Sequence, residues 1–455
     1  MLVRWLSIVA LVVQGCSAGV PAVAPPRSSL PVPTRLVLDN GVRLIIQEHR
    51  ASDVVALHLW VGAGGRDERA DELGFSHFVE HMLFKGTTRR GPGFVDRDVE
   101  GVGGRTNAGT SLDYTFYYLL LPARHAASGI ELLADVAFNS VFDPKEMERE
   151  RQVIFEEVRL SEDNARRSLM RQLYGLVFDS HPYGRPVLGA EAAMKAASRE
   201  TLRGYYSRHY VPENMAVVVA GAVDPEAVRA TVLRAFGSVP PAGFRRAPIP
   251  APPPVEKGRR KEVPRPEKQA WLGLGWPAPR VDHPDALAVD LLASILGGSR
   301  SSRLHQSLRE RHRVVASIRA SYAALQGGGL FAVAAQLQPG DQEQAERLIL
   351  EEVRGIQTEG VSEAERQRAL IAAESQHAFA TEKAEGLAYA YGYAETVWRL
   401  EAELRYLENL RAVTREHIQE AARRYLDLAR YARLAFVPRE SARGGPGVAP
   451  GGSRE

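Results

Sequence analysis

The sequence predicts an α+β protein made of two homologous domains, each a largely antiparallel sheet packed with helices. The chain has 455 residues, which is more than one hydrophobic core usually organises. A segment rich in proline and charge, residues 246–266, divides it into two nearly equal halves. Both halves mix strand-like and helical patterns without strict alternation, which favours helices packed on a largely antiparallel sheet.

Strand-like runs rich in β-branched and aromatic residues occur in both halves. We expect a hairpin within residues 36–46, because Asn40-Gly41 separates two such runs. Ordered chain therefore begins near Leu36. The other strand-like runs are Val54–Val61, Thr110–Leu121, Met215–Ala220, Ala270–Leu274 and Gly329–Gln336.

The two halves resemble distant copies of each other. Residues 143–157 have the same helical cadence as residues 362–376, and residues 73–83 parallel residues 286–296. This pairing sets four first-half positions against four second-half positions: His77, Glu80, His81 and Glu157 against Asp290, Ala293, Ser294 and Gln376.

The first half carries a pattern typical of a zinc site, His77-Phe-Val-Glu-His81. On a helix, residues 77, 80 and 81 share one face, which presents two imidazoles and a carboxylate. Histidines at i and i+4 converge on one metal ion, and the intervening Glu80 can take a proton from water as the general base. A helix that holds these residues by chance is the alternative interpretation.

A second helical segment, residues 146–158, offers candidate carboxylate ligands. Its apolar face contains Met147, Val153 and Ile154, together with Glu150 and Glu157. A carboxylate on an apolar face is costly unless it meets a cation, and a metal ion that already holds two histidines would supply one. Alternatively, this face is solvated. Glu148 and Glu156 lie off it and are the better candidates for solvent exposure.

The residues GFSHFVEHMLFKGT and ERQVIFEE resemble the pitrilysin and mitochondrial-processing-peptidase family of HxxEH zinc peptidases. Further similar stretches are NGVRL (40–44), GGRTNAGTSLDYTFYY (103–118), HPYGRPVLG (181–189), YVPENMAVVVAG (210–221) and GGSRSSRLHQSLRER (297–311). The resemblance extends from about Leu36 to Pro438.

The resemblance implies a zinc endopeptidase whose two domains form a clam-like chamber for unfolded peptides. It implies one Zn²⁺ per chain, with His77, His81 and Glu157 as ligands, Glu80 as the base and Glu150 as an additional glutamate behind the ligands. It further implies that an edge strand binds substrate backbone by β-augmentation, although a simple hairpin arm would explain the same residues. That strand comprises Gly104, Arg105, Thr106, Asn107 and Ala108.

The second half departs from the family pattern at one position. Active single-subunit members carry an arginine and, seven residues later, a tyrosine that contact substrate. Here Arg309 matches the arginine, but Ala316 occupies the tyrosine position. We therefore expect this chain to be a zinc-bearing subunit. Its partner is expected to be a paralogous subunit that carries the arginine and the tyrosine, or a second copy of this chain in a homodimer. Alternatively, Tyr322 compensates. A non-catalytic scaffold and a peptide-binding lipoprotein are the competing functions.

The N-terminus is typical of an exported protein. Arg4 precedes an apolar run at residues 5–13, which is too short to span a bilayer. Residues 13–16, Val-Gln-Gly-Cys, resemble a bacterial lipobox, and Cys16 is the only cysteine. We expect a lipid anchor in the outer membrane facing the periplasm, since Ser17 rather than aspartate follows the cysteine. Plain signal cleavage near Ala18 is the alternative.

Composition limits the partners. The net charge is +3 and the 58 basic residues are scattered, so no nucleic-acid partner is expected. The basic cluster at residues 257–261 is interpreted as solvated linker. No run of eighteen apolar residues occurs, so membrane contact is expected only through the anchor.

The expected parts of the chain follow from these patterns. They are a signal peptide (1–16), a Pro/Ser tether (17–34), a zinc-bearing domain (35–245), a linker (246–266), a homologous domain without metal ligands (267–440) and a disordered tail (441–455).

Overall fold

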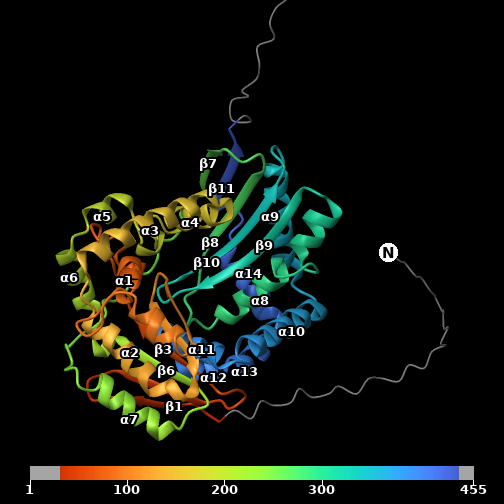
Figure 1. Ribbon diagram of the computed structural model, residues 1–455. Helices are drawn as coiled ribbons and strands as arrows, with labels where there is room; N and C mark the ends of the chain where they lie inside the picture. The colour runs from red at the N-terminus through yellow and green to blue at the C-terminus, as the bar shows by residue number, and fades with distance from the viewer. Residues whose placement is uncertain (1–30, 440–455) are drawn as a thin grey trace, which may run out of the picture. The chain divides into compact units, whose positions relative to one another are not determined.

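The computed structural model describes residues 31–439, which form two β-sheets with helices packed on them (Figure 1). The signal peptide, the lipobox-like end, most of the tether and the tail lie outside the described residues. The first sheet has the strand order β1-β2-β6-β3-β5-β4, and all of its neighbouring pairs are antiparallel except β2–β6. Its strands are β1 (Thr34–Val37), β2 (Arg43–Glu48), β3 (Val54–Val61), β4 (Arg105–Thr110), β5 (Thr115–Pro122) and β6 (Met215–Gly221).

The second sheet has the strand order β7-β11-β8-β10-β9, and β7–β11 is its one parallel pair. Its strands are β7 (Arg259–Arg265), β8 (Ala270–Ala278), β9 (Val315–Ala324), β10 (Gly329–Leu337) and β11 (Ala432–Pro438). The α+β prediction is therefore confirmed. Strand β7 lies within the segment expected to be the linker, so that part of the segment belongs to the second sheet.

Helices follow the strands in both halves. The first half contains α1 (Phe75–Leu83), α2 (Ala126–Asn139), α3 (Pro144–Asp163), α4 (Ala165–Phe178), α5 (Glu191–Ala196), α6 (Arg199–His209) and α7 (Pro225–Phe236). The second half contains α8 (Ala286–Gly297), α9 (Gln342–Glu359), α10 (Glu363–Ala380), α11 (Ala384–Val397), α12 (Leu400–Leu404), α13 (Tyr406–Arg411) and α14 (Arg415–Tyr425). Between residues 31 and 439, none of these helices has the length and hydropathy needed to cross a membrane.

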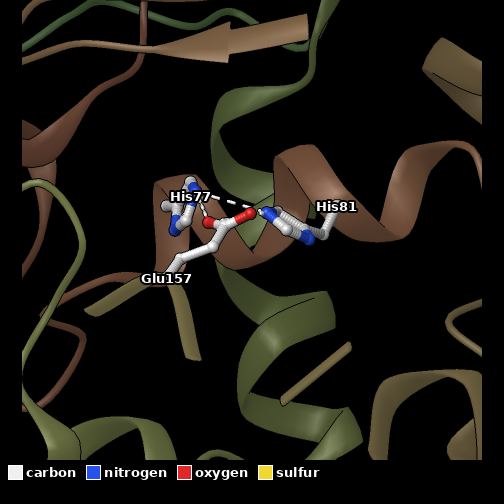
Figure 2. A group of neighbouring side chains, drawn as sticks. All are labelled: His77, His81 and Glu157. Atoms are coloured by element: carbon white, nitrogen blue, oxygen red, sulfur yellow. Dashed lines mark hydrogen bonds and ion pairs between the residues drawn. The ribbon is translucent and has the colours of Figure 1, made fainter. Parts of the chain in front are cut away.

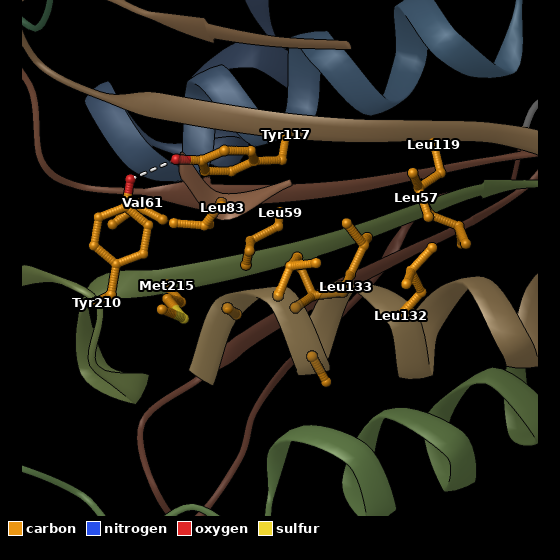
Figure 3. Packing of buried hydrophobic residues seen from close by; sticks show 14 of the residues in the cluster. Leu57, Leu59, Val61, Leu83, Tyr117, Leu119, Leu132, Leu133, Tyr210 and Met215 are labelled. Atoms are coloured by element: carbon orange, nitrogen blue, oxygen red, sulfur yellow. Dashed lines mark hydrogen bonds between the residues drawn. The ribbon is translucent and has the colours of Figure 1, made fainter. Parts of the chain in front are cut away.

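The first core lies between the sheet and helices α1, α2 and α7. Successive side chains of a strand point to opposite faces, so Leu57, Leu59 and Val61 of β3 all enter this core (Figure 3). Leu57 and Leu59 lie on the side of the sheet that faces Leu132 and Leu133 of α2, as Figure 3 shows. This packing holds α1 against β4 and β5.

Each sheet is also covered by a helix from the other half. Helix α4 packs on β8 and β11 of the second sheet, whereas α11 packs on β3 and β6 of the first. Glycines make both contacts possible. A Cβ on Gly275 of β8 would come within 2.8 Å of Val177 on α4, and a Cβ on Gly392 of α11 would overlap the Trp60 ring of β3. Each half therefore contributes one helix, α4 or α11, that packs on the sheet of the other half; we call these two the exchanged helices.

Candidate metal centre

Helix α1 carries the HxxEH residues, and a buried carboxylate fixes its first turn. Glu68 accepts hydrogen bonds from the backbone N–H groups of Gly74 and Ser76, both at 2.8 Å. These N–H groups have no acceptor within the helix. Burial raises the pKa of Glu68 to about 8, although the two hydrogen bonds oppose the rise. Gly74 has φ 98°, a left-handed conformation that suits glycine, at the start of the helix.

Helix α3 packs against α1 and presents the carboxylates. Asp143 begins it as an N-cap, accepting from the backbone N–H of Lys145 at 2.8 Å, and Pro144 follows at the first helical position. Met147, Glu150 and Ile154 are buried, as the sequence predicted for this face. Val153 is 44% exposed, so its placement on the same face was wrong. Position 153 lies about 100° round the helix from Ile154, toward solvent.

His77, His81 and Glu157 converge on one point from these two helices (Figure 2). The two Nε2 atoms lie 3.2 Å apart, and Glu157 Oε2 lies 3.3 Å from that of His77 and 3.6 Å from that of His81. A tetrahedral zinc ion with ligand distances of about 2.0–2.1 Å requires its ligand atoms to be about 3.4 Å apart. The separations among these three side chains would therefore suit a zinc ion held by all three.

The electrostatics of the cluster favour an anionic Glu157. Hydrogen bonds from His77 and His81 lower the pKa of Glu157 well below its usual range. Burial opposes protonation of His81, but its hydrogen bonds with Glu150 and Glu157 outweigh burial and raise its pKa to about 9. Glu156, the neighbour of Glu157, is 62% exposed and pairs with Arg159 instead.

A chain of hydrogen bonds orients His81 from behind. His81 Nδ1 lies 2.8 Å from Glu150 Oε2, and Lys85 Nζ lies 2.8 Å from Glu150 Oε1. Burial would raise the pKa of Glu150, but the hydrogen bonds from His81 and Lys85 lower it. When Nδ1 donates to Glu150, the lone pair of Nε2 faces the ligand cluster. The sequence prediction missed Lys85, although it stands four residues after His81, a spacing that suits a shared helix face.

Glu80 lies beside the ligand cluster and is held by β4. Thr110, the last residue of β4, donates a hydrogen bond from Oγ1 to Glu80 Oε2 at 2.5 Å. Burial raises the pKa of Glu80, and the charge of His77 opposes this rise. The Thr110 contact, which the sequence prediction also missed, links the candidate base to the edge strand.

Strand β4 is the edge of the first sheet and the first arm of the β4–β5 hairpin, and this geometry is compatible with both interpretations of residues 104–108 without deciding between them. Thr106, Asn107 and Ala108 line a cleft of about 640 Å³ together with Glu80, His81 and Glu157. Arg105 instead lies 3.9 Å from Glu385 of α11, and Gly104 precedes the strand. The structure thus brings three of the five predicted edge-strand residues to the candidate metal centre.

The second-half residues lie elsewhere. Arg309 is exposed in a short π-helical segment at residues 305–311, and Ala316 is exposed on β9. Among the described residues, the lining of the cleft includes neither. Tyr322 donates its hydroxyl to the Pro279 carbonyl at 2.7 Å and packs against the second core. It does not line the cleft either, so the structure gives no support to its compensating for the missing tyrosine.

Comparisons with known proteins bear on this geometry. Residues 43–191 match the model described as "Insulinase (Peptidase family M16)", and residues 196–372 match "Peptidase M16 inactive domain". An uncharacterised zinc protease of Bacillus subtilis is 30% identical over 331 residues, covering 73% of this chain and 80% of the relative. The chain belongs to peptidase family M16. The predicted resemblance is therefore confirmed.

Other M16 relatives agree. An uncharacterised zinc protease of Mycobacterium leprae is 32% identical over 338 residues, which cover 73% of this chain and 75% of the relative. A probable mitochondrial-processing peptidase subunit beta of Arabidopsis thaliana is 34% identical over 199 residues, 44% of this chain and 38% of the relative.

Solved structures show the same fold. A protease from Helicobacter pylori has a TM-score of 0.84 at 23% identity and covers 90% of this chain and 100% of its own. A peptidase M16 inactive domain from Pseudomonas fluorescens has a TM-score of 0.81 at 18% identity, covering 90% of this chain and 98% of its own. The described residues thus have the M16 fold, with two domains of α+β structure.

Proposed function

We propose that the chain is a zinc metalloendopeptidase that hydrolyses unfolded peptides, with His77, His81 and Glu157 as the zinc ligands and Glu80 as the general base. The observation that carries the proposal is the set of 3.2–3.6 Å separations among the three ligand atoms, which match one tetrahedral ion. Zinc supplies Lewis acidity when bound, making water nucleophilic at neutral pH and polarising a carbonyl.

The protein's own groups do the remaining work. Glu80 takes the proton from the attacking water and delivers it to the leaving amine, while the Thr110 hydroxyl keeps the Glu80 carboxylate directed at the cleft. The open edge of β4 binds the peptide as an added strand through backbone hydrogen bonds, which recognise extended chains of many sequences. Glu150 and Lys85 hold the His81 ring in place.

A second subunit completes the enzyme in this proposal. The developing oxyanion needs donors beyond the metal, and Ala316 has none to offer. A paralogous partner with the arginine–tyrosine pair, or a second copy of this chain, would close over the cleft and form the peptide chamber. Since a missing oxyanion donor costs roughly 10²–10³ in rate, the isolated chain should cleave weakly. Export and anchoring through Cys16 complete the proposal, placing the enzyme in the periplasm at the outer membrane.

Metal removal tests the activity. The chain is assayed on an unfolded peptide, with and without the candidate partner, after dialysis against a chelator and again after zinc is added back. We expect chelation to abolish cleavage and zinc to restore it. Cleavage that survives chelation would refute the metal mechanism.

The competing function is a non-catalytic scaffold or peptide-binding protein of the same fold. Its support is that the model matching residues 196–372 describes an inactive domain. In the first half, however, the three proposed zinc ligands form one cluster, and the proposed base Glu80 lines the cleft beside it. A chain that binds peptide and zinc yet cleaves nothing, even with the partner present, would establish this alternative.

A further inference from the structure

We propose that a pocket beneath the start of the interdomain segment binds a multivalent anion of the phosphate class, independently of the proposed peptidase activity. The pocket has a volume of about 600 Å³, within the usual range for small-molecule sites. It lies between the end of α6, the residues around Arg69, and residues 242–250, and it does not share lining residues with the cleft at the metal centre.

The pocket is strongly basic. Five arginines and one aspartate line it: Arg66, Arg69, Arg208, Arg245, Arg246 and Asp67. Like charges gathered in one concave surface raise the local potential and attract anions.

Carboxylates compensate three of these arginines. Arg246 pairs with Asp67 at 2.7 Å, and Arg66 pairs with Asp113 at 3.2 Å. Arg208 pairs with Glu72. Two further carboxylates of this region bind backbone N–H groups rather than arginines. Glu68 accepts from Gly74 and Ser76, and Glu213 accepts from Gly243 and Phe244.

Arg69 and Arg245 are left without a carboxylate partner among residues 31–439. Three of the five guanidinium groups are thus paired with carboxylates, and two are not. His209 also lines the pocket. The pocket therefore offers a ligand two guanidinium groups that have no carboxylate partner.

These groups suit a phosphate-class ligand better than a single carboxylate. A guanidinium group matches two oxygens of a phosphate with two parallel hydrogen bonds, and two such groups call for at least two negative charges. Phe244 and Ile249 give the pocket an apolar side, which suits a ligand with a carbon portion. A soluble organic phosphate and a phospholipid headgroup share this chemistry.

Binding of inorganic pyrophosphate to the zinc-loaded full chain, measured by calorimetry at physiological salt, tests the proposal. Arg69→Ala/Arg245→Ala should weaken binding about tenfold or more, because charge-assisted hydrogen bonds are lost. Both side chains are exposed, so the variant should fold. Arg203→Ala/Arg300→Ala, which removes two exposed arginines outside the pocket, should leave affinity within about twofold.

A second arm distinguishes the ligand sources. Co-sedimentation with phosphatidylglycerol vesicles, compared with phosphatidylcholine vesicles, is measured for the same variants. Loss of vesicle binding in Arg69→Ala/Arg245→Ala supports a lipid headgroup as the source, and loss of pyrophosphate binding supports a free anion. Absence of both kinds of binding, or binding that the double variant leaves unchanged, would overturn the proposal.

Discussion

The two halves of the molecule share a plan but differ at one helix pair. In the first half, α1 packs on α3 and directs His77 and His81 at Glu157. In the second half, α8 packs on α10, and the paired positions are Asp290, Ala293, Ser294 and Gln376. Within residues 31–439, the first-half cluster is the one group of three side chains positioned to share a metal ion.

This difference shows that the helix pair packs without the histidines and glutamates of the metal cluster. Helix α8 carries Asp290 at the position paired with His77, and there the carboxylate accepts a hydrogen bond from Tyr406 at 3.4 Å, whereas the first half buries His77 and the carboxylate of Glu150. Burying polar groups reduces stability unless they find partners. Lys85 and His81 supply them for Glu150. The first half therefore carries chemistry that the second half, a packing partner, does without.

The largest expected effect is on turnover. Glu80→Gln should lower peptide hydrolysis by about 10²–10⁴-fold, because a general base is lost. Zinc content and the thermal unfolding temperature should stay near wild type, since Glu80 is not one of the proposed ligands. The assay compares hydrolysis by variant and wild type, each with the partner present. Hydrolysis at a near wild-type rate would remove Glu80 from the mechanism.

A smaller effect concerns zinc affinity. Lys85→Met removes the cation that holds Glu150. The zinc dissociation constant should therefore rise by about tenfold, which is the lower end of the range observed when a residue that orients a metal ligand is changed. Lys85→Arg keeps the charge and should restore most of the affinity. Competition with a fluorescent chelator measures both. If Lys85→Met binds zinc as tightly as Lys85→Arg and the wild type do, Lys85 has no orienting role.

The smallest effect concerns the exchanged helices. Gly392→Ala places a methyl group against Trp60 and should lower the free energy of unfolding by about 1–3 kcal/mol. Gly355→Ala in α9 is the matched control, because its Cβ would meet only Arg303 Nη1, at 3.7 Å. Urea denaturation should show the control at or slightly above wild type. Equal stabilities for the two variants would contradict tight packing of α11 on the first sheet.

The fold class and much of the candidate site were predictable because they depend on local periodicity. Strand β3 lies at Val54–Val61 as predicted, and the hairpin at Asn40 is present as β1–β2. The helical period of residues 146–158 placed Glu150 and Glu157 on the side of α3 that faces α1. The run Thr110–Leu121 was wrongly taken as one strand. Residues 111–114 form a turn between β4 and β5, closed by the Ser111 N–H to Tyr114 carbonyl hydrogen bond, and no proline or glycine marks it.

The features that the sequence did not predict depend on contacts between residues far apart in the chain. The pattern of α11 shows an apolar face, but nothing local says that this face covers the first sheet rather than the second. The contacts of Glu80 with Thr110 and of Gly74 with Glu68 join residues whose proximity depends on the sheet order and on the entry to α1. Periodicity contains no such information.

Zinc stoichiometry tests the central claim most directly. The purified full chain and its Glu156→Gln variant should each hold about one equivalent of zinc, because Glu156 points to solvent and pairs with Arg159. Glu157→Gln should lose most of its zinc, since a neutral amide is a poor ligand beside two imidazoles. Metal analysis after dialysis against zinc-free buffer gives the numbers. One equivalent retained by Glu157→Gln, or equal loss from both variants, would contradict the assignment of the metal centre to His77, His81 and Glu157.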